Sequence, residues 1–142
     1  MSHSSITAFD STVQITNTWI HELMEELGWD DRHRAYSALR VVLHALRDRL
    51  TINEVAALGA QLPMLVRGFY YEGWQPEGKP LKERKKQEFL SHIGSALRDE
   101  DGVDSEKVAR AVFYVLAKHV TGGALEHVKS VLPRELWPLL VS

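Results

Sequence analysis

Three kinds of residue in this sequence could do chemistry: histidines, neighbouring carboxylates, and clustered arginines and lysines. The chain has seven histidines, and none is spaced as a His-x-x-x-His or His-Glu-x-x-His pair, the spacing that places two metal ligands on one helix face. The acidic neighbours Glu25–Glu26 and Asp99–Asp101 fall at expected helix ends or in loops, without an apolar setting that would prepare a carboxyl for acid–base work. Ser37 has no base at a fixed spacing, and no glycine pattern that cradles phosphate is present. We therefore expect no metal site, no cofactor and no enzymatic activity.

Clustered cations offer a second chemistry, the binding of an anion. Arg47 and Arg49 flank Asp48 at the end of an expected helix, where cations complement the last carbonyl groups. The structural interpretation is that the two arginines bind those carbonyls, while Asp48 orients one of them or ties the helix to the Gly-Trp corner. The alternative is an anion site built from Arg47, Arg49 and Arg67. A run of basic residues with interleaved glutamates follows, and it comprises Lys79, Lys82, Arg84, Lys85 and Lys86. This run is either a solvated helix face or a docking site for an anion or partner.

Four aromatic residues stand close together in the middle of the chain. Successive helical residues point in different directions, so these four side chains cannot all enter one core. Tyrosine and tryptophan are typical both of anchored corners and of interface hot spots. The cluster either packs as a corner or contacts a partner, and its candidate partner-binding residues are Phe69, Tyr70, Tyr71 and Trp74.

The stretch from Leu46 to Pro76 also resembles a DNA-binding helix-turn-helix. Its opening, Thr51-x-x-Glu54, has the form of a capping box. A DNA-reading second helix needs polar and basic residues on its outer face, whereas "PMLVRGFYY" is apolar with a single arginine. The sequence therefore predicts two helices and a packed corner, and nucleic acid is an unlikely partner.

Composition bounds the class of protein. The 142 residues are 44% hydrophobic and 25% charged, with a formal net charge of −2, which gives no general attraction for nucleic acid or anionic membranes. The absence of cysteine excludes disulfides and thiolate chemistry and fits a reducing cytoplasm. The first ten residues lack the basic and apolar regions of a secretory signal, and no apolar run approaches the ~20 residues that span a bilayer. We expect a soluble cytoplasmic protein without a membrane partner.

The hydrophobic periodicity predicts an all-α fold, and it repeats after 70 residues. Trp19 aligns with Phe89, and the pair Leu62-Pro63 aligns with Leu132-Pro133. We infer two tandem copies of a roughly four-helix unit, residues 10–72 and 80–142, joined by a Gly/Pro linker at 73–79. Neither copy can cover its apolar stripes alone, so we expect a single domain over residues 10–142.

Helix boundaries follow from capping residues. In the first copy we expect a helix over residues 11–27 ended by Gly28, a second behind Asp30 or Asp31, a third behind Thr51, and a fourth from Pro63. In the second copy we expect helices over residues 82–97, 105–119 behind Asp104, 123–130, and a short one from Pro133 that Pro138 limits.

Several motifs are similar to those of a known family. The stretch "LHALRDRLTINEVAALGAQLPMLVRGFYYEGWQP" and the later "FLSHIG", "VARAVFYVLAKHV" and "LPRELWPLL" resemble the bacterial domain-of-unknown-function family 2267. The resemblance covers about Ile15 to Leu140 and implies a small, two-repeat, all-helical cytoplasmic protein of bacteria. It implies no activity, because the family has none assigned. One departure is that Thr121–Ala124 lacks the glutamate of the family's second capping box.

The sequence therefore favours a non-enzymatic protein-interaction or scaffold module, binding a protein partner or a second copy of itself. Its expected contact surface is the aromatic cluster Phe69–Trp74 with the adjacent linker. The alternative is a regulator that binds a small anion or nucleic-acid phosphate through Arg47, Arg49, Arg67 and the basic run at 79–86.

Overall fold

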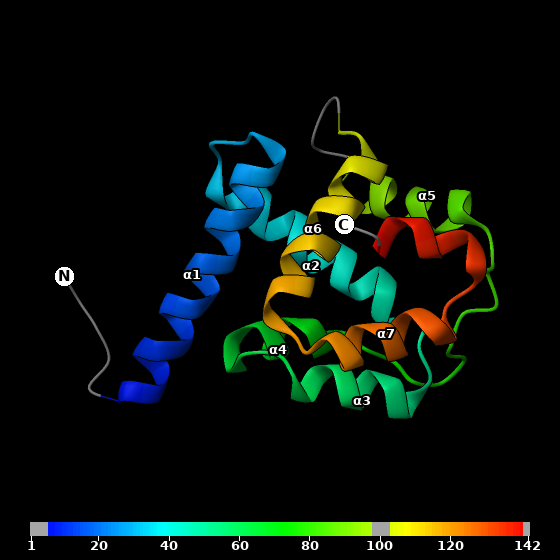
Figure 1. Ribbon diagram of the computed structural model, residues 1–142, viewed down its shortest axis with the longest axis horizontal. Coiled ribbons are helices and arrows are strands. Elements are labelled where there is room, and N and C mark those ends of the chain that lie inside the picture. The colour runs from blue at the N-terminus through cyan, green and yellow to red at the C-terminus, as the bar shows by residue number, and fades with distance from the viewer. Residues whose placement is uncertain (1–5, 98–102, 141–142) are drawn as a thin grey trace.

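The computed structural model describes residues 6–97 and 103–140, and all regular secondary structure within these ranges is helical (Figure 1). The predicted all-α class is therefore confirmed. No helix among the described residues combines the length and the apolar character needed to cross a membrane. In chain order the helices are α1 Thr7–Leu27, α2 Arg32–Arg47, α3 Ile52–Ala60, α4 Met64–Tyr71, α5 Lys86–Ala96, α6 Ser105–His119, α7 Gly122–Val131 and the 3₁₀ helix η1 Arg134–Leu140.

Helices α2 and α6 form the centre of the molecule. Helix α2 contacts α1, α4, α5 and α6, and helix α6 contacts α1, α2, α5 and η1. Alanines at Ala35, Ala38, Ala109 and Ala111 are buried on these two helices, and small side chains let helix axes approach closely. Buried residues from both predicted copies form one hydrophobic cluster. The duplication itself stays a prediction.

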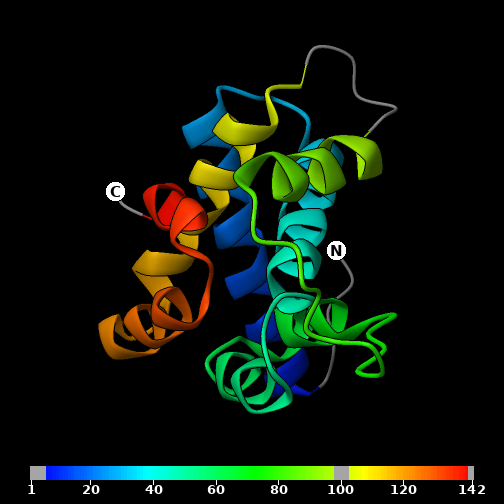
Figure 2. The same ribbon diagram turned by 90° about the vertical axis from the view of Figure 1, so that its right-hand side faces the viewer.

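The remaining helices cover this central pair. Helix α3 lies against α4 and α7, while α5 and η1 pack on α6. Figure 2 shows α5 and the α3–α4 pair toward opposite ends of α2. Helix α1 lies along α2 and α6, and its first turns extend beyond the other helices at the lower left of Figure 1. The core does not cover these first turns, and no residue from Thr7 to Ile15 is buried.

The capping residues act as the sequence predicts. The Asp31 carboxylate accepts a hydrogen bond from the Arg34 amide (3.1 Å), and the Asp104 carboxylate accepts from two amides at the start of α6. The Thr51 and Thr121 hydroxyls accept from the amides of residues 54 and 124, at 3.5 and 3.1 Å. Gly28 ends α1 in the left-handed conformation (φ 68°), which a residue without Cβ adopts at little cost.

Three boundaries differ from the prediction. Helix α1 begins at Thr7, whereas the prediction placed its start near residue 11. Helix α5 begins at Lys86 rather than near residue 82, and residues 82–85 are not helical. Pro138 does not end the last helix, since η1 continues through it to Leu140. A 3₁₀ helix has φ values close to the one that the proline ring fixes, so the ring fits and one amide donor is lost.

Candidate functional site

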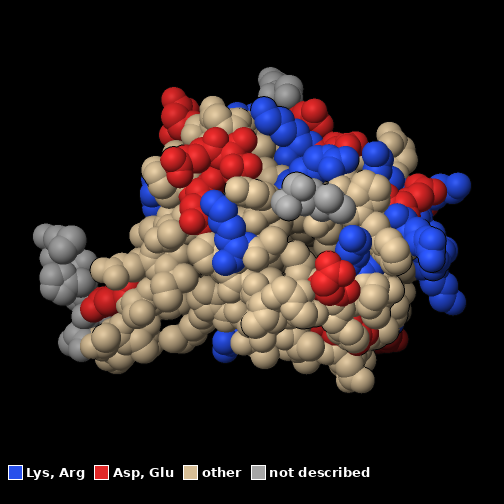
Figure 3. Space-filling view, in the orientation of Figure 1, with Lys and Arg blue, Asp and Glu red and all other residues tan. Residues whose placement is uncertain are grey.

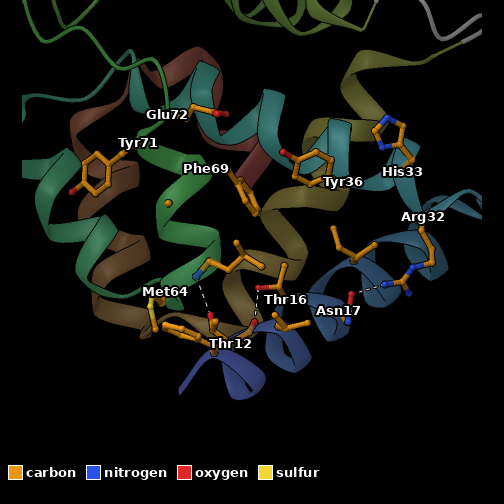
Figure 4. Close-up of a pocket in the computed structure, with 15 residues that line it drawn as sticks. Thr12, Thr16, Asn17, Arg32, His33, Tyr36, Met64, Phe69, Tyr71 and Glu72 are labelled. Carbon is orange, nitrogen blue, oxygen red and sulfur yellow. Dashed lines mark hydrogen bonds between the residues drawn. The ribbon is translucent and has the colours of Figure 1, made fainter. Parts of the chain in front are cut away.

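A groove lies between α1 and α4 and is closed at one end by the start of α2. Its volume is 990 Å³. Figure 4 shows the groove with the side chains of α1 along one side and those of α4 along the other. The lining residues are Phe9, Thr12, Val13, Thr16, Asn17, Ile20, Arg32, His33, Tyr36, Met64, Leu65, Gly68, Phe69, Tyr71 and Glu72.

Helix packing determines where this groove lies. Thr16 and Ile20 on α1 are buried, so they fix the face that α1 turns toward the body. One turn earlier, the Thr12 hydroxyl accepts a hydrogen bond from the Leu65 backbone amide at the start of α4 (2.9 Å; Figure 4). This amide is one of the four that a helix start leaves without an intrahelical acceptor. The bond holds the two helices side by side, and the Phe69 and Tyr36 rings, 5.3 Å apart and perpendicular, lie between them.

Polar groups in the groove bind one another. The Thr16 hydroxyl donates to the Thr12 carbonyl (2.7 Å), and Arg32 donates to the Asn17 side chain (Figure 4). At the other side Arg40 donates two hydrogen bonds to one Glu72 carboxylate oxygen, at 2.8 and 3.0 Å. These contacts occupy polar groups within the chain and leave a mainly apolar surface for a ligand.

The apolar side chains at the groove mouth are exposed to solvent. Phe9 is 49% exposed, Val13 46%, Met64 47% and Leu65 42%. Charged residues are sparse on the two helices that form the walls, with Asp10 between residues 7 and 18 and Arg67 within α4. In Figure 3 charged side chains gather over the upper part of the molecule, whereas the projecting start of α1 is largely uncharged. Such a surface has the composition of an interface core, which is depleted of charge.

The aromatic cluster predicted to contact a partner is divided between the core and the groove. Phe69 is 8% exposed and Tyr70 is fully buried, while Tyr71 and Trp74 are partly buried against the core. The Tyr70 hydroxyl donates to the Val55 carbonyl (2.8 Å), and burial raises the pKa of Tyr70. Tyr70 is therefore a core anchor that no partner can reach in this structure. Phe69 and Tyr71 line the groove.

Arg47 and Arg49, two of the predicted anion ligands, are buried, and their hydrogen bonds go to the chain itself. Arg47 donates to the Tyr70 and Glu72 carbonyls at 2.8 and 3.0 Å, and so ties α2 to the end of α4. Arg49 donates to the Ala45 carbonyl (2.9 Å) and to the Glu83 carboxylate (2.6 Å). Burial lowers the pKa of Arg49, and the nearby Glu83 carboxylate acts in the opposite direction.

Arg67, the third predicted anion ligand, points elsewhere. Its guanidinium donates to the Gly59 and Leu62 carbonyls, at 2.9 and 2.8 Å, and so satisfies the carboxyl end of α3. Because Arg47, Arg49 and Arg67 bind different carbonyl groups, the structure does not bring their donors together around a shared ligand.

The basic run at 79–86 is non-helical up to residue 85 and ends with the first residue of α5, Lys86. Lys82, Arg84 and Lys85 are exposed, whereas Lys79 and Lys86 are partly buried. The Lys86 ammonium pairs with Glu106 (3.1 Å), and the Arg110 and Lys86 hydrogen bonds lower the pKa of that carboxyl. The run therefore has three exposed cations, and Lys79 lines a separate cavity that also includes Arg40 and the buried Arg49.

Several histidines pair with single carboxylates. His119 binds Glu22 (2.6 Å) and stacks on the Trp19 ring, and His127 binds Glu54 (3.1 Å). The His44 ring bonds the Phe69 carbonyl (2.6 Å), and burial lowers the pKa of His44. Among the described residues no three His, Asp or Glu side chains converge as metal ligands would. His3 and the acidic residues 99–101 lie outside the described residues.

Sequence reasoning missed the groove. Its mouth is formed by Phe9, Val13, Met64 and Leu65, none of which was a candidate, and Gly68 on α4 also lines it. A signal for the α1 residues was present, because Phe9 and Val13 continue the apolar spacing of the buried residues that follow. The sequence gives no sign that this stripe adjoins α4.

Comparison with known proteins identifies the family. The family model described as "Uncharacterized conserved protein (DUF2267)" matches residues 16–139, which is most of the chain. No curated protein matches the chain. The predicted resemblance is confirmed, and the chain belongs to the DUF2267 family.

Proposed function

We propose that this protein is a non-enzymatic protein-interaction module whose binding surface is the groove between α1 and α4. The observation that carries the proposal is the exposed apolar mouth of the groove, at Phe9, Val13, Met64 and Leu65, each at least 42% exposed. Contiguous apolar surface of this kind costs free energy in water and marks interaction sites on soluble proteins. The proposal includes a bacterial cytoplasmic location, which the lack of cysteine supports.

An amphipathic helix suits the groove better than a small molecule does. A small-ligand site combines apolar walls with a few polar groups that are free to orient the ligand. In this groove Thr12, Asn17 and Glu72 already bind groups of the chain. Helix-in-groove recognition, in contrast, relies on apolar anchors at positions i, i+3 or i+4, and i+7.

The lining residues also support a role without catalysis. His33 stacks near Tyr36, with ring centroids 6.2 Å apart, and Glu72 is held by Arg40. The Thr12 and Thr16 hydroxyls are hydrogen-bonded to backbone groups of α4 and α1, so both are already engaged within the chain.

The alternative function, binding of an anion or nucleic-acid phosphate, has less support. It relied on Arg47, Arg49 and Arg67, whose guanidinium groups donate to carbonyls of the chain. In the basic run Lys86 pairs with Glu106, three cations are exposed next to the glutamates of the same segment, and Lys79 lines a cavity with Arg49, whose own donors are engaged. Binding that weakened steeply with salt would revive this alternative.

Site-specific photocrosslinking in the native cells tests the proposal. A photoreactive phenylalanine analogue replaces Met64 at the groove mouth, and a matched variant carries it at Ile52, which is 57% exposed and outside the groove. We expect a discrete protein adduct from position 64 and none from position 52. Adding Phe9→Glu, which places a charge in the apolar mouth, should abolish the adduct. The absence of any adduct from position 64 would overturn the proposal.

A further inference from the structure

We propose that the occupant of the α1–α4 groove is the first part of α1 from a second copy of this chain, so that two copies exchange these segments reciprocally. This inference rests on the proposed function, because it names the partner of the same groove. Four observations carry it: the spacing of apolar residues on α1, the weak support of its first turns, a glycine on α4, and the match in length.

The apolar residues of α1 form a continuous stripe along one face of the helix, here called the seam. Only the second part of the seam is buried within the chain itself. From Thr16 onward the seam is buried in the core, whereas Phe9 and Val13 are nearly half exposed. Spacing that alternates between three and four residues is the pattern by which one helix packs along another. The seam residues are Ile6, Phe9, Val13, Thr16, Ile20, Leu23 and Leu27.

The first turns of α1 gain little stability from their own sequence. No residue from Thr7 to Ile15 is buried, and this segment is rich in threonine, serine, valine and isoleucine, which are moderate helix formers. Ile6 stands at the N-cap position and has no side-chain acceptor for the first amides. A helix shorter than about 12 residues is marginal in water without packing. Cover from a second chain would supply that packing.

Gly68 keeps the floor of the groove open. It lies within α4 in an ordinary helical conformation, is exposed, and would have no atom within 4 Å of an added Cβ. The fold therefore does not require glycine at this position, although glycine costs a helix about 1 kcal/mol relative to alanine. A glycine does allow a second backbone to come close. We infer that α4 is shaped to receive a helix at this point.

The first part of α1 and the α1 wall of the groove have similar lengths. The α1 residues that line the groove run from Phe9 to Ile20, about 17 Å of helix, and the segment from Thr7 to Ile15, in which no residue is buried and Thr12 bonds α4, is about 13 Å long. Phe9 and Val13 belong both to the groove and to the exposed part of the seam. In the proposed dimer a two-fold axis passes near these residues, so that the first segment of each copy lies in the groove of the other. Charge does not oppose this contact, because Asp10 is the one charged residue from 7 to 18.

Sedimentation velocity on the full chain, from low to high micromolar concentration, tests the inference. Because each copy would contribute only the short segment from Thr7 to Ile15 and one groove, we expect a reversible dimer of twice the 16.1 kDa chain mass with a micromolar Kd. Val13→Glu and Gly68→Leu should each raise the Kd by about 100-fold, since one charges the seam and the other fills the groove. Ile52→Glu, at an exposed position outside the groove, is the matched control and should leave the Kd unchanged.

Gly68→Leu makes the test decisive, because it fills the groove at an exposed position where an added Cβ meets no atom of the fold within 4 Å. Its thermal midpoint at low concentration should equal or exceed that of the wild type. A wild-type chain that stays monomeric throughout the concentration range, or a dimer that tolerates both groove variants, would overturn the inference. A photocrosslink from position 64 to a different protein, together with a monomeric chain, would reject the second copy while retaining the interaction function. No crosslink at all would reject both.

Discussion

Gly59 on α3 lies directly against the Tyr71 ring at the end of α4, so closely that an added Cβ would come within 2.5 Å of the Tyr71 hydroxyl oxygen. The same hydroxyl lies 3.4 Å from the Val55 carbonyl oxygen. Gly59 therefore makes room for an aromatic ring. The corner is held by packing between α3 and α4.

Gly59→Ala should destabilise the protein despite alanine's better helix propensity. Displacing the Tyr71 ring should cost roughly 1–2 kcal/mol, as overpacked cores do. In a Tyr71→Leu background, where the hydroxyl and ring are absent, the same substitution should be neutral or stabilising. Urea unfolding of the two single variants and the double variant gives the coupling energy. A Gly59→Ala single variant more stable than the wild type would contradict the proposed packing.

Arg47→Met should unfold at much lower urea concentration than the wild type. It leaves the Tyr70 and Glu72 carbonyls without their donor in a buried setting, so we expect a loss of about 2–4 kcal/mol. Arg40→Met is the matched control, because Arg40 makes an exposed ion pair with Glu72 that should contribute less than about 1 kcal/mol. Similar losses in the two variants would show that Arg47 does not anchor α4.

Gly28 and Gly68 should respond to alanine in opposite directions. Gly28 has a φ of 68°, where a Cβ is strained, so Gly28→Ala should cost about 1 kcal/mol or more. Gly68 has ordinary helical geometry and open space, so Gly68→Ala should gain up to about 1 kcal/mol. Thermal unfolding at low protein concentration measures both effects apart from any association. A destabilised Gly68→Ala monomer would mean that glycine serves the fold there.

His44 should make the folded state sensitive to acid. Burial lowers its pKa below the ordinary value of 6.5, so the folded chain holds this proton less tightly than the unfolded chain does. The contribution of neutral His44 to stability is therefore full above pH 6.5 and declines as the pH falls below it. His44→Gln keeps a donor for the Phe69 carbonyl but cannot titrate. The loss of stability from neutral to mildly acidic pH should be smaller in this variant, and an equal loss in both proteins would exclude His44 as the cause.

Local chemistry explains which parts of the fold could be predicted from the sequence. Asp31, Thr51 and Asp104 cap helices through amides two or three residues away, and Gly28 ends α1 by its own conformation. These effects need no knowledge of the tertiary structure. Residues 82–85 were predicted to be helical because charged residues also suit an exposed helix. They are not helical, and the Glu83 carboxylate instead pairs with the buried Arg49 guanidinium.

The candidate site could not be predicted in the same way. The groove depends on the contact between Thr12 and Leu65, and nothing in either local sequence indicates that they meet. The arginines were recognised as able to bind carbonyls or anions, but only the packed structure shows that Arg47 and Arg67 reach backbone carbonyls. Hydrophobic periodicity predicts the apolar stripe on α1, but it does not show which residues of the stripe are buried in the folded chain.

The central position of α6 has a consequence for the order of events during synthesis. Leu39, Val42 and Leu43 on α2 are completed early on the ribosome, whereas α6, which packs on α2, emerges only in the later part of the chain. A nascent chain that has been synthesised only to the end of α4 therefore exposes the apolar surface of α2 that α6 later covers. Closure of the core depends on contacts between distant parts of the chain, which slows folding and leaves the unfinished polypeptide open to chaperones.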